Sequence, residues 1–220
     1  MDKLDNRRPL AVRERGLAKK TAHWLSQQAI TPNQISIASV VFAAAAAACL
    51  LWSPHAAAGT GWVMPLLAAG FIQLRLLCNL FDGMVAVEGG KKTRSGELFN
   101  DIPDRIADPL ILVAAGYAST AVGWGDALGW CAGLLAVLTA YVRTLSASAG
   151  APVDFRGPMA KQHRMALMTG ACVIAAIEAA FGQTAYALPL ALALVVLGAL
   201  VTVYRRTAAA YRYLESTPHV

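Results

Sequence analysis

Six long apolar stretches, each close to the length of a bilayer crossing, constrain the fold of this chain more than any other feature. They run at residues 35–53, 60–87, 97–119, 125–147, 162–181 and 184–205. A helix needs about 20 residues to cross about 30 Å of hydrocarbon. The chain is also 57% hydrophobic, with a mean hydropathy of +0.50. The sequence therefore predicts an all-α integral membrane protein with six transmembrane helices.

The distribution of positive charge predicts the orientation of these helices. Lysine and arginine gather at residues 1–34, 91–94, 143–164 and in the C-terminal tail, whereas the loops at 54–60, 120–124 and 182–184 contain none. By the positive-inside rule, both termini and the loops at 88–96 and 148–161 are cytoplasmic. The net charge of +6 then follows from topology and from attraction to anionic membrane lipids. Nucleic-acid binding is not expected.

Residues 1–34 are predicted to form a cytoplasmic interfacial helix and a linker, ahead of a six-helix domain at 35–220 that ends in a short cytoplasmic tail. Wound as a helix, residues 7–28 place six apolar side chains within an arc of about 140°. These are Leu10, Ala11, Leu17, Ala18, Trp24 and Leu25. This pattern favours a helix lying on the cytoplasmic leaflet. A solvated basic arm is the alternative, because Glu14 and Thr21 interrupt the apolar arc.

The sequence Thr31-Pro32-Asn33-Gln34 predicts the start of the first transmembrane helix. Thr31 can cap the helix, Pro32 suits its first position, and Gln34 completes a capping box. Exposed amides at a helix start beside a membrane surface also favour a phosphate group.

Acidic and amide side chains form one face on each of the second and third predicted helices. Arg75, Asn79, Asp82 and Ala86 lie within an arc of about 60° on the second. On the third, the arc is about 100° and contains Glu97, Asn100, Asp101, Asp104 and Asp108. The two helices are consecutive and antiparallel, so these faces can meet at matching depth. Ionisable groups inside a membrane usually mark a functional site.

Clustered carboxylate and amide oxygens suit a hard cation such as Mg²⁺ or Mn²⁺, which usually shares its coordination with substrate phosphates. We therefore expect a metal-held diphosphate just inside the cytoplasmic interface. One alternative is that Arg75 and Arg105 pair with the carboxylates as buried ion pairs that hold the helices together. A cation transporter is a weaker alternative, because the predicted site lies near one surface and the sequence has no visible inverted repeat.

The spacing of this cluster resembles the signature of the class I CDP-alcohol phosphatidyltransferases, D-x2-D-G-x2-A-R-x8-G-x3-D-x3-D. The corresponding residues are Asn79, Asp82, Gly83, Ala86, Val87, Gly96, Asn100 and Asp104. Every spacing is kept, but asparagine replaces the first and third aspartates, and Val87 replaces the arginine. The pattern is similar to a bacterial branch of the family that carries asparagine at both positions.

The resemblance implies roles for individual residues. In the family, four aspartates hold two divalent metals, and the last is proposed to deprotonate the acceptor alcohol. Asp82 and Asp104 are therefore the expected catalytic residues, both as metal ligands and Asp104 also as base. Asn79 and Asn100 could ligate through carbonyl oxygens. Because the site has two carboxylates fewer than the signature, one bound metal is an alternative to two. Asp101 and Asp108 are secondary candidates for metal ligands, because they would restore the missing negative charge.

The substrate-binding residues are also expected from the resemblance. Those expected near CDP or phosphate are Thr31, Asn33, Gly83, Ala86 and Gly96, and those expected near an anionic acceptor or phosphate are Arg143, Arg156, Lys161 and Arg164. For Arg156, ordinary positive-inside charge is an equal alternative.

The implied activity is transfer of a phosphatidyl group from CDP-diacylglycerol to a polar alcohol, with release of CMP, in phospholipid biosynthesis. The resemblance further implies a homodimer in a bacterial cytoplasmic membrane. Two alternatives stay open. The donor could instead be CDP-choline or CDP-ethanolamine with diacylglycerol as acceptor, or the chain could bind nucleotide or lipid without turnover.

Overall fold

The computed structural model describes residues 16–28, 30–57, 59–88, 90 and 95–216. Within these residues it has seven α-helices and a single 3₁₀ turn at Ser53–His55. The helices are α1 (Gly16–Gln27), α2 (Pro32–Trp52), α3 (Val63–Glu88), α4 (Gly96–Ala118), α5 (Gly125–Ser148), α6 (Lys161–Ala180) and α7 (Ala187–Ser216). The predicted all-α fold is confirmed.

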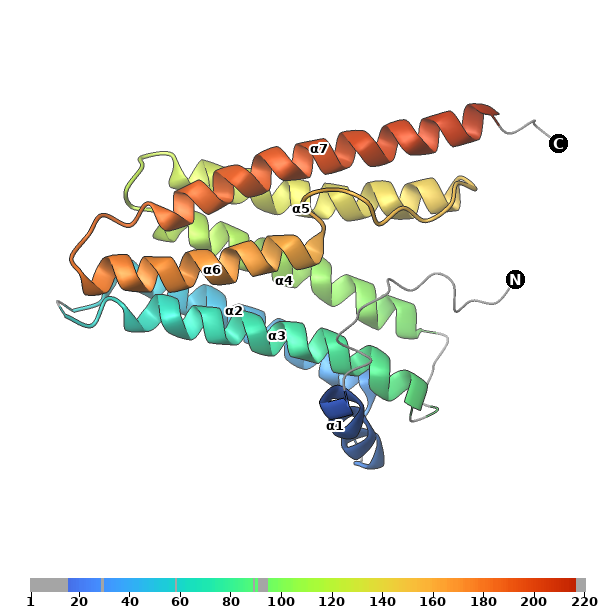
Figure 1. Ribbon diagram of the computed structural model, residues 1–220, viewed down its shortest axis with the longest axis horizontal. Helices are drawn as coiled ribbons and strands as arrows, with labels where there is room; N and C mark the ends of the chain where they lie inside the picture. The colour runs from blue at the N-terminus through green and yellow to red at the C-terminus, as the bar shows by residue number, and fades with distance from the viewer. Residues whose placement is uncertain (1–15, 29, 58, 89, 91–94, 217–220) are drawn as a thin grey trace.

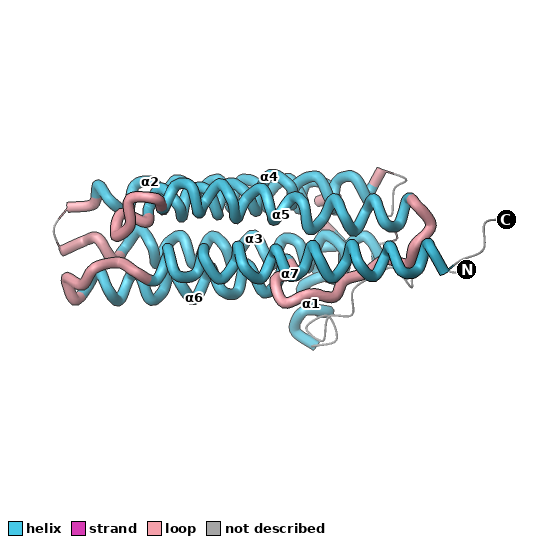
Figure 2. Tube along the Cα trace, turned by 90° about the horizontal axis from the view of Figure 1, so that it is seen from above, coloured by secondary structure: helices cyan, strands magenta, loops and turns pink. Residues whose placement is uncertain are grey.

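The six long helices α2 to α7 run side by side along the long axis of the molecule (Figure 1). Turned by 90°, they form two layers, with α2, α4 and α5 in one and α3, α6 and α7 in the other (Figure 2). Packing closes a ring, because α2 contacts both α3 and α4, α5 contacts α4 and α7, and α6 contacts α3 and α7. Helices α3 and α4 therefore make few direct contacts with each other. Long side chains connect the two helices across the interior of the ring.

Five helical segments are long and apolar enough to cross a membrane: Pro32–His55, Val63–Val87, Gly125–Ser148, Lys161–Ala180 and Ala187–Ser216. Five of the six predicted spans are therefore supported. Helix α4 has 23 residues and lies among the others (Figure 1), but it does not meet the same test within the described residues. Its sequence holds five charged residues, Glu97, Asp101, Asp104, Arg105 and Asp108, which lower its hydropathy.

Small residues let α4 and α5 approach closely. A Cβ atom added to Gly116 would lie 2.7 Å from the Cα of Gly129, and one added to Gly125 would lie 2.7 Å from the backbone oxygen of Ser119. Neither distance is compatible with a real side chain. Close contact of backbones through small residues is a common way in which helices associate in membranes.

Helix α1 packs against α3 and runs across the direction of the other helices (Figure 1). Ala22 is fully buried and packs with Leu80 and Met84 of α3, whereas Trp24 is exposed. The predicted interfacial helix covered residues 7–28, of which 7–15 lie outside the described residues. Its position on the membrane surface stays a prediction.

The predicted capping box at the start of α2 is confirmed. The backbone N–H of Gln34 donates to Thr31 Oγ1 at 3.2 Å, and the backbone N–H of Thr31 donates to Gln34 Oε1 at 2.9 Å. Pro32 occupies the first helical position. The cap fixes where α2 begins, and so it also fixes where Ser36, one turn later, meets α3.

Candidate functional site

The three buried carboxylates and their partners come from α2, α3, α4 and α6. The loop after α5 runs back along the bundle before α6 begins (Figure 1). Lys161 and Arg164, in the first turn of α6, therefore reach the carboxylates of α4. This course of the chain assembles the site from segments that are far apart in the sequence.

Asp104 is held by donors from two other helices. Its Oδ1 atom accepts hydrogen bonds from Arg75 Nη2 at 2.9 Å and from Asn79 Nδ2 at 3.1 Å. Its Oδ2 atom accepts from Lys161 Nζ. Asp104 is only 5% exposed, so two cations balance its charge away from bulk water. The predicted meeting of the two polar faces is confirmed by these contacts.

Asp108 lies one turn beyond Asp104 and is shared between two arginines. Its Oδ1 atom lies 2.5 Å from Arg75 Nη2, and its Oδ2 atom lies 2.5 Å from Arg164 Nη2. All three side chains are almost completely buried. The ion pairing expected for Arg75 is therefore present, and it joins α3, α4 and α6.

Asp82 differs from these two carboxylates because its hydrogen-bond donors are neutral. It accepts from Ser36 Oγ at 2.7 Å and from the backbone N–H of Gly83 at 2.5 Å. It is 3% exposed, and among the described residues no Lys, Arg or His nitrogen forms an ion pair with it. Lys161 and Asp104 lie within electrostatic range. Asp82 is thus the buried carboxylate whose charge is least compensated by direct contact.

Asp101 lies at the edge of the site, on the same helix. It pairs with Arg105 at 2.9 Å and with Arg143 of α5 at 2.9 and 3.1 Å, and its side chain is 39% exposed. Arg105 does pair with this acidic face, but the pair is partly exposed and lies within α4, so it is not the buried pair between helices that was expected. Arg143 also lies over the ring of Phe155, at 5.5 Å from its centre. Asp101 therefore connects the acidic face of α4 to the loop after α5.

Other predicted site residues lie nearer the surface. Asn100 is exposed, and Gly83, Ala86 and Gly96 are half-buried on α3 and α4. At the start of α2, Thr31 is exposed and Asn33 is half-buried. These placements leave their predicted contacts with a nucleotide or metal as predictions.

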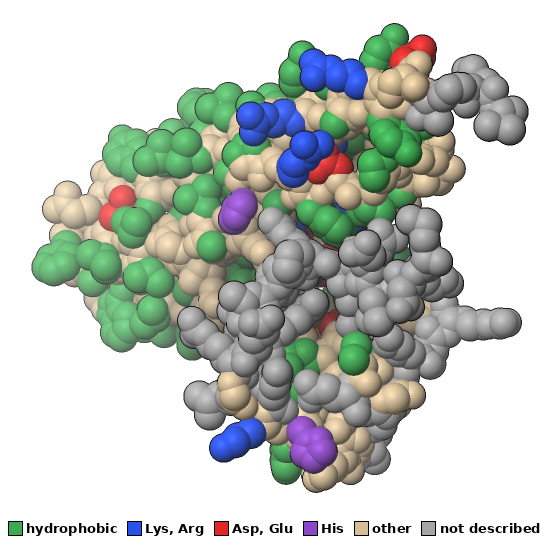
Figure 3. Space-filling model, turned by 45° about the vertical axis from the view of Figure 1, so that its right-hand side comes forward, with side chains coloured by type: hydrophobic (Ala, Val, Ile, Leu, Met, Phe, Trp, Pro, Cys, Tyr) green, Lys and Arg blue, Asp and Glu red, His purple; other side chains and the backbone are tan. Residues whose placement is uncertain are grey.

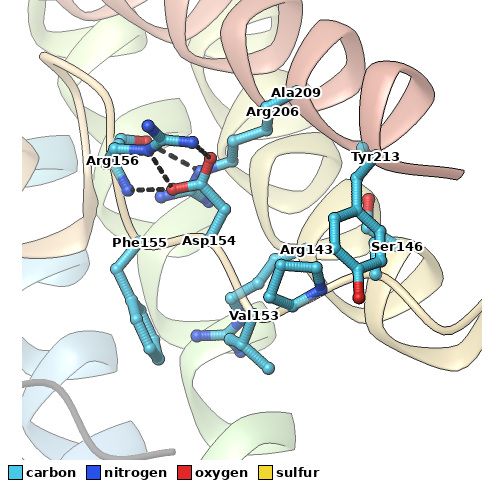
Figure 4. Close-up of a pocket in the computed structure, with 12 residues that line it drawn as sticks. Arg143, Ser146, Val153, Asp154, Phe155, Arg156, Arg206, Ala209 and Tyr213 are labelled. Atoms are coloured by element: carbon cyan, nitrogen blue, oxygen red, sulfur yellow. Dashed lines mark hydrogen bonds and ion pairs between the residues drawn. The ribbon is translucent and has the colours of Figure 1, made fainter. Parts of the chain in front are cut away.

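A cavity of about 470 Å³ lies between the ends of α5 and α7 and the loop that joins α5 to α6 (Figure 4). Its lining residues are Arg143, Ser146, Ala151, Pro152, Val153, Asp154, Phe155, Arg156, Arg206, Ala209, Ala210 and Tyr213. Two of the four predicted acceptor-binding residues, Arg143 and Arg156, lie here. The other two, Lys161 and Arg164, belong to the ion-pair network instead.

Arg206 connects the segments that form the wall of this cavity. Arg206 Nε donates to the backbone oxygen of Arg156 at 3.0 Å, and its Nη1 donates to that of Thr139 at 2.7 Å. Arg206 therefore ties α7 to both the loop and α5. Arg156 in turn donates to both oxygens of Asp154, from Nε and Nη2, at 3.0 Å each. Burial acts to raise the pKa of Asp154, but these hydrogen bonds outweigh it and hold the pKa below its usual value.

Sequence patterns did not single out Ser36 or Arg206. Ser36 follows a capping box in an ordinary apolar helix, and only its place one turn after Pro32 sets it apart. Arg206 lies in a run with Arg205 that has the usual appearance of positive charge beside a membrane. The two arginines lie on different faces of α7, so that Arg206 is buried and Arg205 is exposed.

A larger view shows how these groups relate to the outer surface. Lysine and arginine side chains gather at the end of the bundle where α5 and α7 finish, and hydrophobic side chains cover much of the flank behind it (Figure 3). The cavity, and the Arg143–Asp101 ion pair beside it, therefore lie at the more polar end of the molecule.

No protein-family profile and no curated protein matches the chain. Its structure is similar to the Mycobacterium tuberculosis phosphatidylinositol phosphate synthase PgsA1 with CDP-DAG bound, at a TM-score of 0.72 and 17% identity, covering 92% of this chain and 98% of that one. The chain has the fold of that synthase. The same synthase with manganese and citrate gives 0.70 and 17%, covering 88% of each chain, and its apo form gives 0.69 and 18%, covering 87% and 95%.

Proposed function

We propose that this chain is a metal-dependent CDP-alcohol phosphotransferase. It would transfer a phosphatidyl group from CDP-diacylglycerol to a polar alcohol, with release of CMP, in phospholipid biosynthesis. The observation that carries the proposal is the meeting of Asn79, Asp82 and Asp104 at the signature spacing, in a fold shared over 92% of the chain with a synthase solved with CDP-DAG bound.

The proposal includes the membrane topology. We place α4 in the membrane as the sixth span, because Arg75 and Arg164 neutralise Asp108 and remove much of the cost of its charge in hydrocarbon. Both termini and the site would face the cytoplasm of a bacterium, as the positive-inside rule predicts. A homodimer remains part of the proposal from the family resemblance alone.

The residues around Asp82 fit a divalent cation better than those around Asp104. Asp82 is buried and has neutral donors, and the amide oxygen of Asn79 lies on the same face of α3. Among the described residues, however, no three His, Cys, Asp or Glu side chains are grouped so as to hold a metal. The substrate diphosphate would therefore have to supply ligands, as it commonly does for Mg²⁺. When bound, the cation would stabilise negative charge on the phosphates.

Asp104 would remove the proton from the acceptor hydroxyl. Its two oxygens are held in place by Arg75, Asn79 and Lys161. Because Lys161 Nζ contacts Oδ2, this oxygen becomes available only when Lys161 turns to another anion, and a phosphate of the substrate is the natural partner. The deprotonated alcohol oxygen then attacks the β-phosphate, and the bond to CMP breaks.

The cavity beside Arg143 is the proposed acceptor site. Arg143 contacts Asp101 on α4 and also lines the cavity, so an alcohol bound there lies on the same side of the bundle as the acidic face. Its three arginines favour an anionic or strongly polar acceptor. Transfer from CDP-choline or CDP-ethanolamine to diacylglycerol remains the alternative, and a comparison of donors distinguishes the two reactions.

A second candidate function is binding without turnover. The observation in its favour is that both oxygens of Asp104 already contact cationic side chains. Such a protein would bind a CDP-linked lipid and act as a scaffold or regulator.

The deciding experiment incubates the purified full chain with CDP-diacylglycerol, Mg²⁺ or Mn²⁺, and a panel of alcohols that includes serine, glycerol, inositol and their phosphates. CMP release and lipid products are followed by mass spectrometry, with CDP-choline and CDP-ethanolamine plus diacylglycerol in parallel. We expect metal-dependent CMP release with one acceptor, lost in Asp82→Asn and kept in Asp126→Asn, an exposed acid at the start of α5. Nucleotide binding without CMP release would favour the second candidate.

A further inference from the structure

We propose that Arg75 and Lys161 supply the positive charge of a second cation, so that the site takes one divalent ion, at Asp82. The inference rests on the proposed function and concerns how many metal ions this chain binds. It makes Arg75 a positioning residue, because the guanidinium would act by holding Asp104 and by contributing charge beside it.

The two carboxylates Asp82 and Asp104 have different hydrogen-bond donors. Asp104 accepts from Arg75, Asn79 and Lys161, so its two oxygens already contact three donors, two of which are charged. Among the described residues, Asp82 accepts only from a hydroxyl and a backbone N–H. A metal can approach Asp82 by displacing neutral donors, whereas at Asp104 it must displace a buried arginine.

The buried acidic and basic side chains of the site balance each other in charge. Three buried carboxylates, Asp82, Asp104 and Asp108, face three cations, Arg75, Lys161 and Arg164. The cluster is therefore neutral before any ligand binds. A CDP-linked substrate brings one negative charge on each phosphate of its diphosphate, and a single divalent ion balances both. A second ion would leave excess positive charge in a region of low dielectric, where uncompensated charge is costly.

Arg75 is held through only one of its three guanidinium nitrogens among the described residues. Its Nη2 atom contacts both Asp104 and Asp108, while Nε and Nη1 are buried and have no hydrogen-bond partner among the described residues. Buried donors are normally satisfied, yet Arg75 has two that the described residues leave without a partner, and Arg164 has one, its Nε. Arg75 therefore keeps hydrogen-bonding capacity on the side of the guanidinium away from the two carboxylates.

The sequence differs from the family signature at positions close to Arg75. Asparagine occupies positions 79 and 100, where the signature has aspartate, and Arg75 lies one helical turn before Asn79. The amide of Asn79 donates to the same oxygen as Arg75. An aspartate at position 79 could not donate this hydrogen bond, so Asn79 and Arg75 form a consistent pair.

The test counts bound Mn²⁺ by electron paramagnetic resonance in the purified full chain, with CDP-diacylglycerol present. We expect one Mn²⁺ per chain in the wild type, and two in the double variant Arg75→Gln/Asn79→Asp, with the spectral broadening that two neighbouring Mn²⁺ ions produce. Arg75→Lys should keep one. Arg212→Gln, an exposed arginine near the end of α7, is the control and should also bind one.

Two Mn²⁺ ions in the wild type, or none, would overturn the inference, and this result does not depend on whether any variant folds. A folded double variant that still binds one would overturn the role given to Arg75. CMP release is measured in the same samples, so the two proposals fail separately. One Mn²⁺ without CMP release for any alcohol contradicts the transferase, whereas CMP release with two Mn²⁺ ions contradicts only the count.

Discussion

Arg75 Nη2 and Asp108 Oδ1 lie 2.5 Å apart, with side chains that are 0% and 2% exposed. Arg164 approaches the other oxygen of the same carboxylate at the same distance. Asp108 thereby connects α3 and α6 to α4, although α3 and α4 make few direct contacts with each other. The relative position of the acidic face and the basic start of α6 depends on this carboxylate together with Asp104, which contacts Arg75 and Lys161.

Replacement of Asp108 by alanine should destabilise the protein more than any other single change in the acidic face. It leaves two buried arginines without their common partner, and loss of one member of a buried ion pair costs about 3–5 kcal/mol. Thermal unfolding in detergent measures the effect, with Asp126→Ala as control. An equal unfolding temperature for the two variants would contradict the structural role of Asp108.

Replacement of Asp82 by asparagine should abolish turnover while the fold is kept. The variant retains the shape and the hydrogen bond from Ser36 but loses the charge that attracts the cation. We expect kcat to fall by about 10²–10³-fold, the size typical of losing one major electrostatic contact to the transition state. Ser36→Ala should reduce activity less, by about tenfold, because it removes one neutral donor, worth about 1.5 kcal/mol, and keeps the charge of Asp82. Activity equal to wild type in Asp82→Asn would contradict the site assignment.

Replacement of Arg206 by glutamine should loosen the loop after α5. The change removes donors to the backbone oxygens of Arg156 and Thr139. Hydrogen exchange should become faster at residues 151–157, and KM for the acceptor should rise by about tenfold, or about 1.4 kcal/mol, with a smaller change in kcat. The matched control is Arg205→Gln, which alters the exposed neighbour. An unchanged exchange rate in Arg206→Gln would refute the tie between α7 and this loop.

Substitution of Gly116 by alanine should separate α4 from α5. The added Cβ would lie 2.7 Å from Gly129 Cα, so a backbone must move, and overpacking of this kind costs about 1–3 kcal/mol. Gly170→Ala is the matched control, because a Cβ at this position in α6 meets nothing within 4 Å. We expect a lower unfolding temperature for Gly116→Ala only. Equal stability of the two variants would show that α4 and α5 are farther apart than the structure places them.

Helical periodicity was sufficient to predict the parts of the site that depend on one helix at a time. Asn79 and Asp82 share a face of α3 because their spacing is close to one turn, and the same holds for Asp104 and Asp108 on α4. The pairing of Arg105 with Asp101, also one turn apart, follows from the same local geometry.

The remaining contacts depend on how distant segments are arranged, which no local pattern encodes. Lys161 meets Asp104 because the loop after α5 folds back along the bundle, and a hydropathy profile does not predict the course of a loop. Ser36 meets Asp82 because α2 contacts both α3 and α4. The charged residues of α4 lower its hydropathy below that of the other five long helices, and the pairing of these charges with residues of other helices becomes visible only in three dimensions.

The ion pairs of α4 have a consequence for biosynthesis. Arg164 follows Asp108 by 56 residues, which at about 5–20 residues per second is a delay of about 3–11 s during translation. Throughout that interval Arg75, already synthesised, is the only arginine of the pair that can neutralise Asp108. The ribosome therefore delivers α3 and α4 with Arg75 as the shared partner of Asp104 and Asp108, and the arrival of α6 adds Lys161 and Arg164 to neutralise the remaining charge.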